Sequence, residues 1–287
     1  MALLEVDDVV VQFGGVTAVD HAVFAVEPGQ ITGLIGPNGA GKTTCFNVIT
    51  GLQKPTKGHV RFDGKDITSL SVHRRSRRGM ARTFQRLEAF GSLTVRENVK
   101  VALDIHRGIR GLVRRSSTDI DALLERVGVA AYAEERADSI PTGAARLLEL
   151  ARCLAGEPKL LLLDEPSSGL DESETDAFGA LLKDLTREGK AVLMVEHDMD
   201  LVMGVCDDIH VLDFGKVIAS GKPAEIRTNA AVQKAYLGYS DEDERPSEQT
   251  RTDLAPVGAG AGYADPYDEG ATTVIPAVTA PIDQENR

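Results

Sequence analysis

The feature of this chain that most constrains its fold is a glycine-rich octapeptide, Gly36-Pro37-Asn38-Gly39-Ala40-Gly41-Lys42-Thr43. It fits the pattern G-x-x-x-x-G-K-[ST], whose glycines let backbone N–H groups close around phosphate oxygens. The apolar run before it, residues 31–35, predicts a buried strand, and the run that begins at Thr44 predicts the start of a helix. This motif requires a strand, a glycine loop and a helix in that order, and the helix N-terminus favours an anion. The sequence therefore predicts a nucleotide-phosphate site in an α/β fold.

A second motif supplies groups that a hydrolytic site at this loop requires. The four leucines of residues 160–163 predict a buried strand, which presents Asp164 and Glu165 at its carboxyl end, where open α/β sheets bind ligands. We expect Lys42 to reach the β- and γ-phosphates, and Thr43 and Asp164 to hold Mg²⁺ or its water shell. Glu165 is placed to polarise the attacking water as general base. The alternative for Asp164 and Glu165 is an acidic pair on the surface after a strand.

Composition is that of a globular chain. The 287 residues are 42% hydrophobic, which is ample for one large α/β domain or two small ones. No apolar stretch approaches the ~20 residues of a membrane helix, and the acidic residues 1–8 lack a signal-peptide pattern. Cys45, Cys153 and Cys206 form no CxxC pair, so we expect reduced, mostly buried thiols of a cytosolic protein.

Charge is distributed unevenly along the chain. The net charge is −12, and residues 239–287 hold 11 acidic and 3 basic residues, a net of −8. This balance disfavours general nucleic-acid binding, which requires a basic surface. Because residues 239–287 are also rich in Pro, Gly, Ala and Thr, we expect a disordered tail after a folded domain that spans residues 1–238. The tail is either a flexible spacer or a docking segment.

The spacing of apolar residues outlines the remaining elements. Residues 1–35 alternate apolar and polar side chains, which predicts antiparallel strands with one buried face, and residues 58–68 predict a further strand and turn. Residues 87–156 have a helical period. Further strands are expected near residues 159–163, 191–195, 210–213 and 216–220, with a helix over about 174–188. This order predicts an α/β core with a small antiparallel piece and an inserted helical segment.

Together the motifs resemble the ATP-binding cassette (ABC) ATPases, over roughly residues 3–238. The resemblance implies an α/β fold, a P-loop NTPase core of the ABC type with an antiparallel β-subdomain and an inserted α-helical subdomain at about residues 87–156. It also implies ATP and Mg²⁺ as cofactors. The nucleotide-binding residues that it implies are Phe13, Gly36, Pro37, Asn38, Gly39, Ala40, Gly41, Lys42, Thr43 and Thr44.

Further functional residues follow from the same resemblance. Gln85 matches the Q-loop glutamine, which in the family senses Mg²⁺ beside Thr43 and Asp164 and links to the transmembrane partner. Asp171 matches the D-loop, and His197 matches the switch histidine at the γ-phosphate. Phe13, about thirty residues before the lysine of the loop, matches the aromatic that stacks on adenine. Taken singly, Gln85 would be a surface residue, His197 a structural histidine and Phe13 a core residue.

One family motif is altered. The signature, commonly written LSGGQ, binds the γ-phosphate of ATP held by the other subunit of a dimer, and the aligned residues here are Ile140-Pro141-Thr142-Gly143-Ala144. Pro141 takes the serine position and lacks an N–H donor, although proline is acceptable at a helix start. Ala144 takes the glutamine position, whereas Gly143 keeps a backbone donor and Thr142 offers a hydroxyl. Loss of a preorganised phosphate donor lowers a rate by on the order of 10²-fold. We therefore hypothesise pairing with a second, non-identical ATPase subunit.

Two stretches resemble one subfamily, the ATPases of branched-chain amino acid importers. They are residues 79–99 and the ending Ala235-Tyr236-Leu237-Gly238. The ATPases of that subfamily work as heteromeric pairs beneath integral-membrane permeases. The resemblance therefore implies permease subunits as partners, no nucleic acid, and a peripheral location at the cytoplasmic face of the membrane. Residues 86–93 would line the groove that receives the permease's coupling helix.

Three other functions stay open at this point. A lipopolysaccharide-export type ATPase is the nearest transport alternative. Soluble non-transport ABC ATPases commonly join two cassettes or carry a long coiled-coil insertion, whereas this chain has one cassette and no sustained heptads. A regulator that binds ATP without hydrolysis is disfavoured by Glu165 and His197.

The arginine-rich run at residues 73–78 invites a different interpretation. We expect a solvated helix face there rather than a nucleic-acid site. A position near anionic lipid headgroups is the second interpretation.

Overall fold

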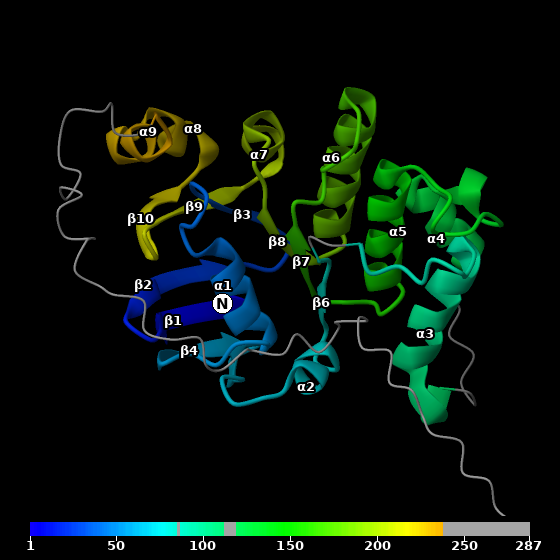
Figure 1. Cartoon of the computed structure of the whole chain (residues 1–287), viewed down its shortest axis with the longest axis horizontal. Coiled ribbons are helices and arrows are strands. Elements are labelled where there is room, and N and C mark those ends of the chain that lie inside the picture. The colour runs from blue at the N-terminus through cyan, green and yellow to red at the C-terminus, as the bar shows by residue number, and fades with distance from the viewer. Residues whose placement is uncertain (85–86, 112–118, 238–287) are drawn as a thin grey trace, which may run out of the picture. The chain divides into compact units, whose positions relative to one another are not determined.

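The computed structural model describes residues 1–84, 87–111 and 119–237. Its strands are β1 (Leu4–Phe13), β2 (Val16–Val26), β3 (Ile31–Ile35), β4 (Lys57–Phe62), β5 (Lys65–Asp66), β6 (Met80–Arg82), β7 (Leu160–Asp164), β8 (Ala191–Val195), β9 (Asp208–Asp213) and β10 (Lys216–Gly221). They form a four-stranded sheet of order β2-β1-β4-β5 and a six-stranded sheet of order β10-β9-β3-β8-β7-β6 (Figure 1). The predicted tail, residues 239–287, lies outside the described residues.

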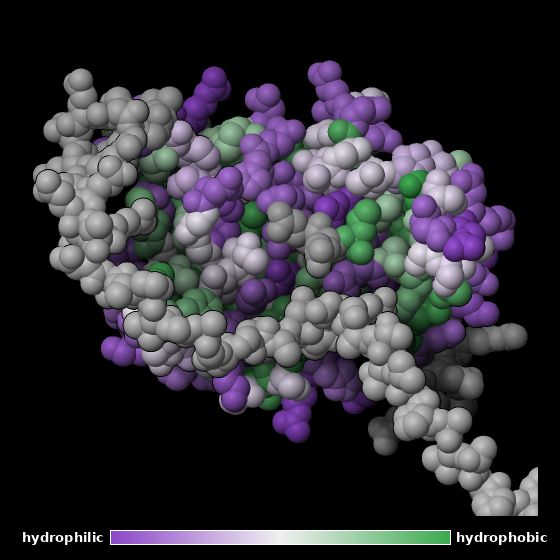
Figure 2. Space-filling model, viewed as in Figure 1, coloured by the Kyte–Doolittle hydropathy of each residue, from purple (hydrophilic) through white to green (hydrophobic). Residues whose placement is uncertain are grey.

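The helices surround the six-stranded sheet. They are α1 (Lys42–Thr50), α2 (Val72–Ser76), α3 (Val95–Gly111), α4 (Ile120–Val127), α5 (Thr142–Leu154), α6 (Glu172–Arg187), α7 (Met199–Val205), α8 (Pro223–Thr228) and α9 (Ala230–Leu237), with a 3₁₀ turn, η1 (Ala130–Tyr132). In Figure 1, α3, α4 and α5 gather beyond β6, the edge strand of the sheet. These three helices form the inserted helical segment that the sequence predicted. Within the described ranges, no helix has the length and apolar character needed to cross a bilayer, and hydrophilic residues predominate on the face drawn in Figure 2.

Strand β7 shows how the large sheet divides two hydrophobic cores. Leu161 and Leu163 face one core, which also contains residues of α5, α6 and α7. Leu160 and Leu162 face the other, which contains residues of α1, β1 and β2. Side chains alternate across a strand, so a run of four leucines fills both cores. The described residues up to 237 thus form three layers, with the antiparallel sheet and α1 on one face of the parallel strands and helices on the other (Figure 1).

The prediction of antiparallel strands through residue 35 was right for β1 and β2 and wrong for β3. Strands β1 and β2 pair antiparallel, whereas β3 pairs in parallel with both β8 and β9. All five residues of β3 are buried, because both faces of this central strand are covered. Alternation with one wet face does not apply to such a strand. Helix α1 also begins at Lys42, two residues before the predicted start, so Lys42 and Thr43 form its first turn.

The arginine-rich run lies on and after α2, and one of its arginines is buried. Arg75 is 2% exposed. Its Nη1 donates to the carbonyl oxygens of Val48 and Ile49 at 2.7 Å each, in the last turn of α1. A cation there satisfies and stabilises helix C-terminal carbonyls. The predicted solvated face is therefore wrong for Arg75, and it is right for Arg74, Arg77 and Arg78, which are exposed.

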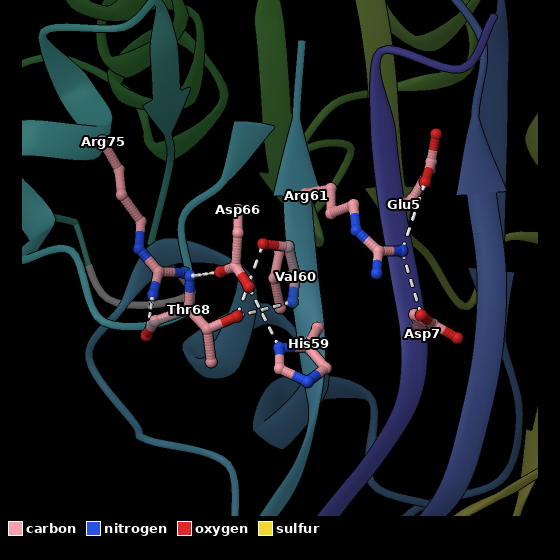
Figure 3. A network of polar contacts seen from close by, with 8 residues as sticks. All are labelled: Glu5, Asp7, His59, Val60, Arg61, Asp66, Thr68 and Arg75. Atoms are coloured by element: carbon pink, nitrogen blue, oxygen red, sulfur yellow. Dashed lines mark hydrogen bonds and ion pairs between the residues drawn. The ribbon is translucent and has the colours of Figure 1, made fainter. Parts of the chain in front are cut away.

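Figure 3 shows how Arg75 of α2 also reaches the antiparallel sheet through Thr68. Its Nη2 donates to the carbonyl oxygen of Thr68 at 2.9 Å. The Thr68 hydroxyl accepts the N–H of Val60, on β4, at 2.9 Å, and the Thr68 N–H donates to the carboxylate of Asp66 at 2.8 Å. The run 73–78 thus contributes to the fold through Arg75.

Candidate functional site

The glycine loop leaves β3 and enters α1, and two of its glycines are required by close packing. Gly36 and Gly41 have φ angles of 150° and 104°. A Cβ on Gly36 would lie 2.0 Å from the carbonyl oxygen of Leu212, and one on Gly41 would lie 2.4 Å from that of Ala18. Strands β2 and β9 therefore pack closely against the loop, and only glycine fits at these two positions.

Lys42 is held inside this loop. Its side chain is 7% exposed, and Nζ donates to the carbonyl oxygens of Gly36 at 2.6 Å and Pro37 at 3.0 Å. Burial lowers the pKa of Lys42, while the carboxylates of Glu165 and Asp164 act in the opposite direction. The ammonium group therefore lies in the field of the acidic pair that follows β7.

The other residues predicted to bind the nucleotide differ in their exposure to solvent. Phe13 ends β1 with 51% of its surface exposed, so its ring is available for stacking. The loop presents some residues to solvent and buries others. Asn38, Gly39 and Thr43 are exposed, Pro37 and Thr44 are half-buried, and Gly36 and Ala40 are buried.

Three adjacent parallel strands end at one edge of the sheet. Strand β8 lies between β3 and β7, so His197, after β8, emerges between the glycine loop and Glu165, after β7. The His197 Nε2 lies 3.1 Å from the Glu165 Oε1. Glu165 has a φ of 50°, a left-handed conformation that is uncommon outside glycine and concentrates at functional sites. We call this grouping the nucleotide edge: residues 36–43, Asp164, Glu165 and His197.

Glu196 supports the nucleotide edge and was missed by the sequence analysis. It is 4% exposed. Its Oε1 accepts the N–H of Ser167 at 2.8 Å, and its Oε2 accepts the N–H of His197 at 3.0 Å. The carboxylate therefore links the loop after Glu165 to the loop that carries His197. An acidic residue directly after a fully buried strand was the available signal.

Arg82, the last residue of β6, was also missed. Its Nη2 lies 3.0 Å from the Asp164 Oδ2, and the two side chains are only 7% and 4% exposed. Its Nη1 donates to the Asn47 Oδ1 of α1 at 2.7 Å. Burial lowers the pKa of Arg82, and Asp164 opposes that shift. Nothing in the local sequence pattern distinguishes this arginine from its neighbours in the run before it.

The nucleotide edge carries oxygen donors of the kind that Mg²⁺ prefers. These donors are the carboxylate of Asp164 and the hydroxyl of Thr43, which is exposed in the first turn of α1. The ion pair with Arg82 engages Oδ2 of Asp164 and leaves Oδ1 outside it. The residues present therefore fit the metal. Gln85, the third predicted ligand, lies outside the described residues.

Asp171 has a structural contact of its own. It is the N-cap of α6, where its Oδ1 accepts the N–H of Glu174 at 2.8 Å and its N–H donates to the Glu174 Oε2 at 2.9 Å. This reciprocal capping box satisfies two N–H groups at the helix start. It fixes where the loop after Glu165 ends.

The altered signature begins helix α5. Pro141 is its N-cap, with no side-chain cap hydrogen bond. Pro141 and Thr142 are exposed, whereas Gly143 and Ala144 are buried. A Cβ on Gly143 would lie 2.8 Å from the carbonyl oxygen of Gly169, so the start of α5 packs against the loop before α6. Of the four predicted signature residues, Thr142 therefore presents the exposed hydroxyl.

A groove of about 1130 Å³ lies between α2, β6 and the helices α3 and α5. Its lining includes Val72, Arg82, Phe84, Glu88, Ile105 and Arg152. Ile105 is 72% exposed. Glu88 belongs to the predicted groove segment, residues 86–93, whereas Arg86 lies outside the described residues.

The chain is similar to known proteins over most of its length. The family model of the ABC transporter matches residues 19–168, and that of the branched-chain amino acid ATP-binding cassette transporter matches residues 216–242. The chain is 41% identical over 249 residues to the high-affinity branched-chain amino acid transport ATP-binding protein BraF of Pseudomonas aeruginosa, with 82% of this chain and 98% of BraF covered. It is 39% identical over 251 residues to the corresponding protein LivG of Escherichia coli, at the same coverage.

A more distant relative and two solved structures complete the comparison. The lipopolysaccharide export system ATP-binding protein LptB of Haemophilus influenzae is 32% identical, with 83% of this chain and 98% of LptB covered. A nucleotide-free ATP-binding cassette from an ABC transporter has a TM-score of 0.74 at 28% identity, covering 83% of this chain and 100% of its own. A dimeric cassette in a post-hydrolysis state, bound to ADP and phosphate, has a TM-score of 0.68 at 25% identity, covering 77% of this chain and 98% of its own.

Proposed function

This chain belongs to the ATP-binding cassette transporter family, and on that premise we propose that it is the ATP-hydrolysing subunit of an importer for branched-chain amino acids or a related small solute. The substrate class rests on the names of BraF and LivG, at 41% and 39% identity, and on the match to the branched-chain family model. LptB, the export protein, is less similar at 32%. Uptake is therefore favoured over lipopolysaccharide export.

The observation that carries the hydrolytic proposal is the 3.1 Å approach of His197 to Glu165 beside the glycine loop. Lys42 binds the β- and γ-phosphates, and Phe13 stacks on adenine. Glu165 takes a proton from a water molecule whose oxygen attacks the γ-phosphorus. The bond from that phosphorus to the bridging oxygen breaks, which leaves ADP and phosphate, while His197 orients the γ-phosphate. Mg²⁺, when bound to Thr43 and Asp164, neutralises charge on the phosphates.

The groove lined by Phe84 and Ile105 is proposed as the docking site for a permease. Its exposed apolar side chains suit a partner helix, and the nucleotide edge is reached from it through Arg82. Such docking would hold the chain at the cytoplasmic face of the membrane as a peripheral subunit.

We further propose that the second ATPase subunit is not identical to this chain. The support is local: Pro141 offers no N–H, and the side chain at the glutamine position, Ala144, is 5% exposed and packs in the core. Thr142 alone would contribute a side-chain donor to the ATP of the partner. The nucleotide edge of this chain, in contrast, would receive the partner's signature.

Solute uptake by a reconstituted complex tests the function. The chain is co-expressed with candidate permease subunits and a second ATPase, reconstituted with ATP inside the vesicles, and assayed for radiolabelled leucine uptake driven by an added solute-binding protein. We expect ATP-dependent uptake that Glu165→Gln in this chain abolishes. A complex that hydrolyses ATP but moves no branched-chain amino acid would reject the substrate class. A chain that assembles with no permease would reject the transport role.

A further inference from the structure

Arg82 occupies a position between the groove and the nucleotide edge. It is the last residue of β6, and it pairs in register with Leu162 of β7, two residues before Asp164. The guanidinium group therefore reaches both the carboxylate of Asp164, at 3.0 Å, and the amide oxygen of Asn47 on α1, at 2.7 Å. One side chain thus joins the strand that ends at the metal carboxylate to the helix that follows the phosphate loop.

The guanidinium group of Arg82 is held rather than free to swing. It lies over the ring of Phe46, with 5.4 Å from the guanidinium carbon to the ring centroid, and over the ring of Phe84, with 5.0 Å. Arginine combines planar stacking on aromatic faces with forked hydrogen bonding, a combination that lysine lacks. With 7% of its side chain exposed, Arg82 is a fixed counter-charge for Asp164.

The second support for Asp164 comes from the residue next to Arg82. The Asp164 N–H donates to the Thr83 Oγ1 at 3.2 Å, and the Thr83 N–H donates to the carbonyl oxygen of Leu162 at 3.0 Å. The end of β6 therefore positions Asp164 through its backbone and through its carboxylate.

Phe84 connects this support to the groove. It lines the groove, is 36% exposed, and stacks on Arg82. Its carbonyl oxygen accepts a hydrogen bond from the Arg146 Nη1 of α5 at 2.8 Å. Four residues on, Glu88 is held from α5 as well, because its N–H donates to the Glu149 Oε1 at 2.6 Å and its carbonyl oxygen accepts from the Arg152 Nη1 at 2.6 Å. A partner helix that displaces Phe84 therefore acts on Arg82 and α5 together.

We propose that Arg82 is a positioning residue for the magnesium site: it orients Asp164 so that Oδ1 faces the metal, and through Phe84 it makes that orientation respond to whatever occupies the groove. The first half concerns the lone chain. The second half rests on the proposed transport function, because it requires a permease in the groove.

The first test measures metal binding rather than turnover. The dissociation constant of ADP for the full chain is determined by calorimetry in excess Mg²⁺ and in EDTA. The value in EDTA divided by the value in Mg²⁺ is the ratio that reports how much Mg²⁺ strengthens ADP binding. We expect Arg82→Met to lower this ratio about tenfold, equivalent to about 1.4 kcal/mol, with the EDTA value unchanged. Arg82→Lys, which keeps the charge but loses the fork, is expected to lower it about threefold. Arg74→Met, the matched control, removes an exposed arginine of the same run and should leave the ratio unchanged.

Two results for the Arg82 variants would overturn the proposal. An unchanged ratio in a folded Arg82→Met chain would reduce Arg82 to a packing role and overturn the proposal. A ratio that rises would mean that Arg82 competes with the metal, which overturns it equally. If Arg82→Met does not fold, Arg82→Lys decides by the same two criteria.

The second test repeats the ratio in the permease complex. We expect assembly to change the ratio in the wild type and to leave it unchanged in Phe84→Leu. An equal change in both would overturn the link to the groove and leave the first half standing. Failure of the wild-type chain to assemble would count against the proposed transport function, while the lone-chain result still decides the role of Arg82.

Discussion

The nucleotide edge and the N-terminus of α5 differ in how well their residues suit the contacts proposed for them. At the nucleotide edge, each side chain has the polar group that its proposed contact with phosphate or water requires. At the N-terminus of α5, two of the four signature positions lack such a group. Lys42, Glu165 and His197 are converging polar groups, with His197 and Glu165 at 3.1 Å. Pro141 has no N–H, and Ala144 is buried. Under the proposed pairing, the two halves of a shared site can diverge within one chain, because each half would work with the opposite half of the partner.

The largest expected effect is at the nucleotide edge. Lys42→Ala should weaken ATP binding about 100-fold, because a charge-assisted hydrogen bond to phosphate contributes roughly 1.5–3 kcal/mol. Fluorescence titration with an ATP analogue measures it, with the exposed Lys54→Ala as the control. Affinity within twofold of the wild type would show that the loop does not hold the phosphates as described.

At the other region, Pro141→Ser should raise the ATP turnover of the lone chain about tenfold, recovering part of the loss that a missing phosphate donor causes. Serine restores both an N–H and a hydroxyl, and it is a favoured N-cap. Pro141→Ala restores the N–H alone and separates the two contributions. If both variants fold and neither changes turnover, the altered signature is not what limits the lone chain.

The packing of the start of α5 against the loop before α6 gives a smaller effect. Gly143→Ala places a Cβ 2.8 Å from the carbonyl oxygen of Gly169 and should lower the free energy of unfolding by about 1–3 kcal/mol. Urea denaturation measures it. Gly204→Ala in α7 is the matched control, because a Cβ there meets no atom of the described residues within 4 Å. Equal stability of the two variants would argue against tight packing of α5 on the loop before α6.

The smallest expected effect is a loss of folding stability at mildly acidic pH, caused by a histidine outside the nucleotide edge. His210, on β9, is 6% exposed, and burial lowers its pKa, although the Ala25 carbonyl and Asp208 oppose the shift. The unfolded chain, with a histidine pKa of about 6.5, then binds more protons than the folded chain, so stability falls as pH drops below about 6.5. Thermal melts at neutral and mildly acidic pH should show this loss in the wild type and less of it in His210→Gln. An identical loss in both would assign it to other groups.

The sequence predicted the parts of this molecule whose signal is local. The glycine loop, the strand that ends at Asp164 and the helical insertion all follow from short patterns, and the structure confirms the ABC fold that they indicated. Four consecutive leucines, residues 160–163, are enough to predict a strand buried on both faces. The antiparallel pairing predicted for residues 31–35 was wrong because the partners of β3, β8 and β9, lie more than 150 residues away in sequence. No local pattern encodes a pairing across that separation.

The residues that were missed depend on tertiary contacts. Arg75 and Arg82 belong to a chain segment full of arginines, and their burial is set by α1 and Asp164 rather than by their neighbours in sequence. Glu196 differs, because an acidic residue directly after a buried strand is a readable signal, and its two N–H partners explain its burial. Sequence patterns therefore identify the groups proposed to contact the nucleotide more readily than the groups that position them.

The central claim, that this chain contributes the stronger catalytic half of an asymmetric pair, is tested most directly by phosphate release from the mixed complex. Glu165→Gln is introduced into this chain, and the corresponding glutamate of the partner subunit is changed in a separate complex. We expect Glu165→Gln to lower turnover by on the order of 10²-fold, as for loss of a general base. The change in the partner should lower turnover less than about twofold, because that site would contain the weakened signature. Equal losses from the two substitutions would contradict the asymmetry.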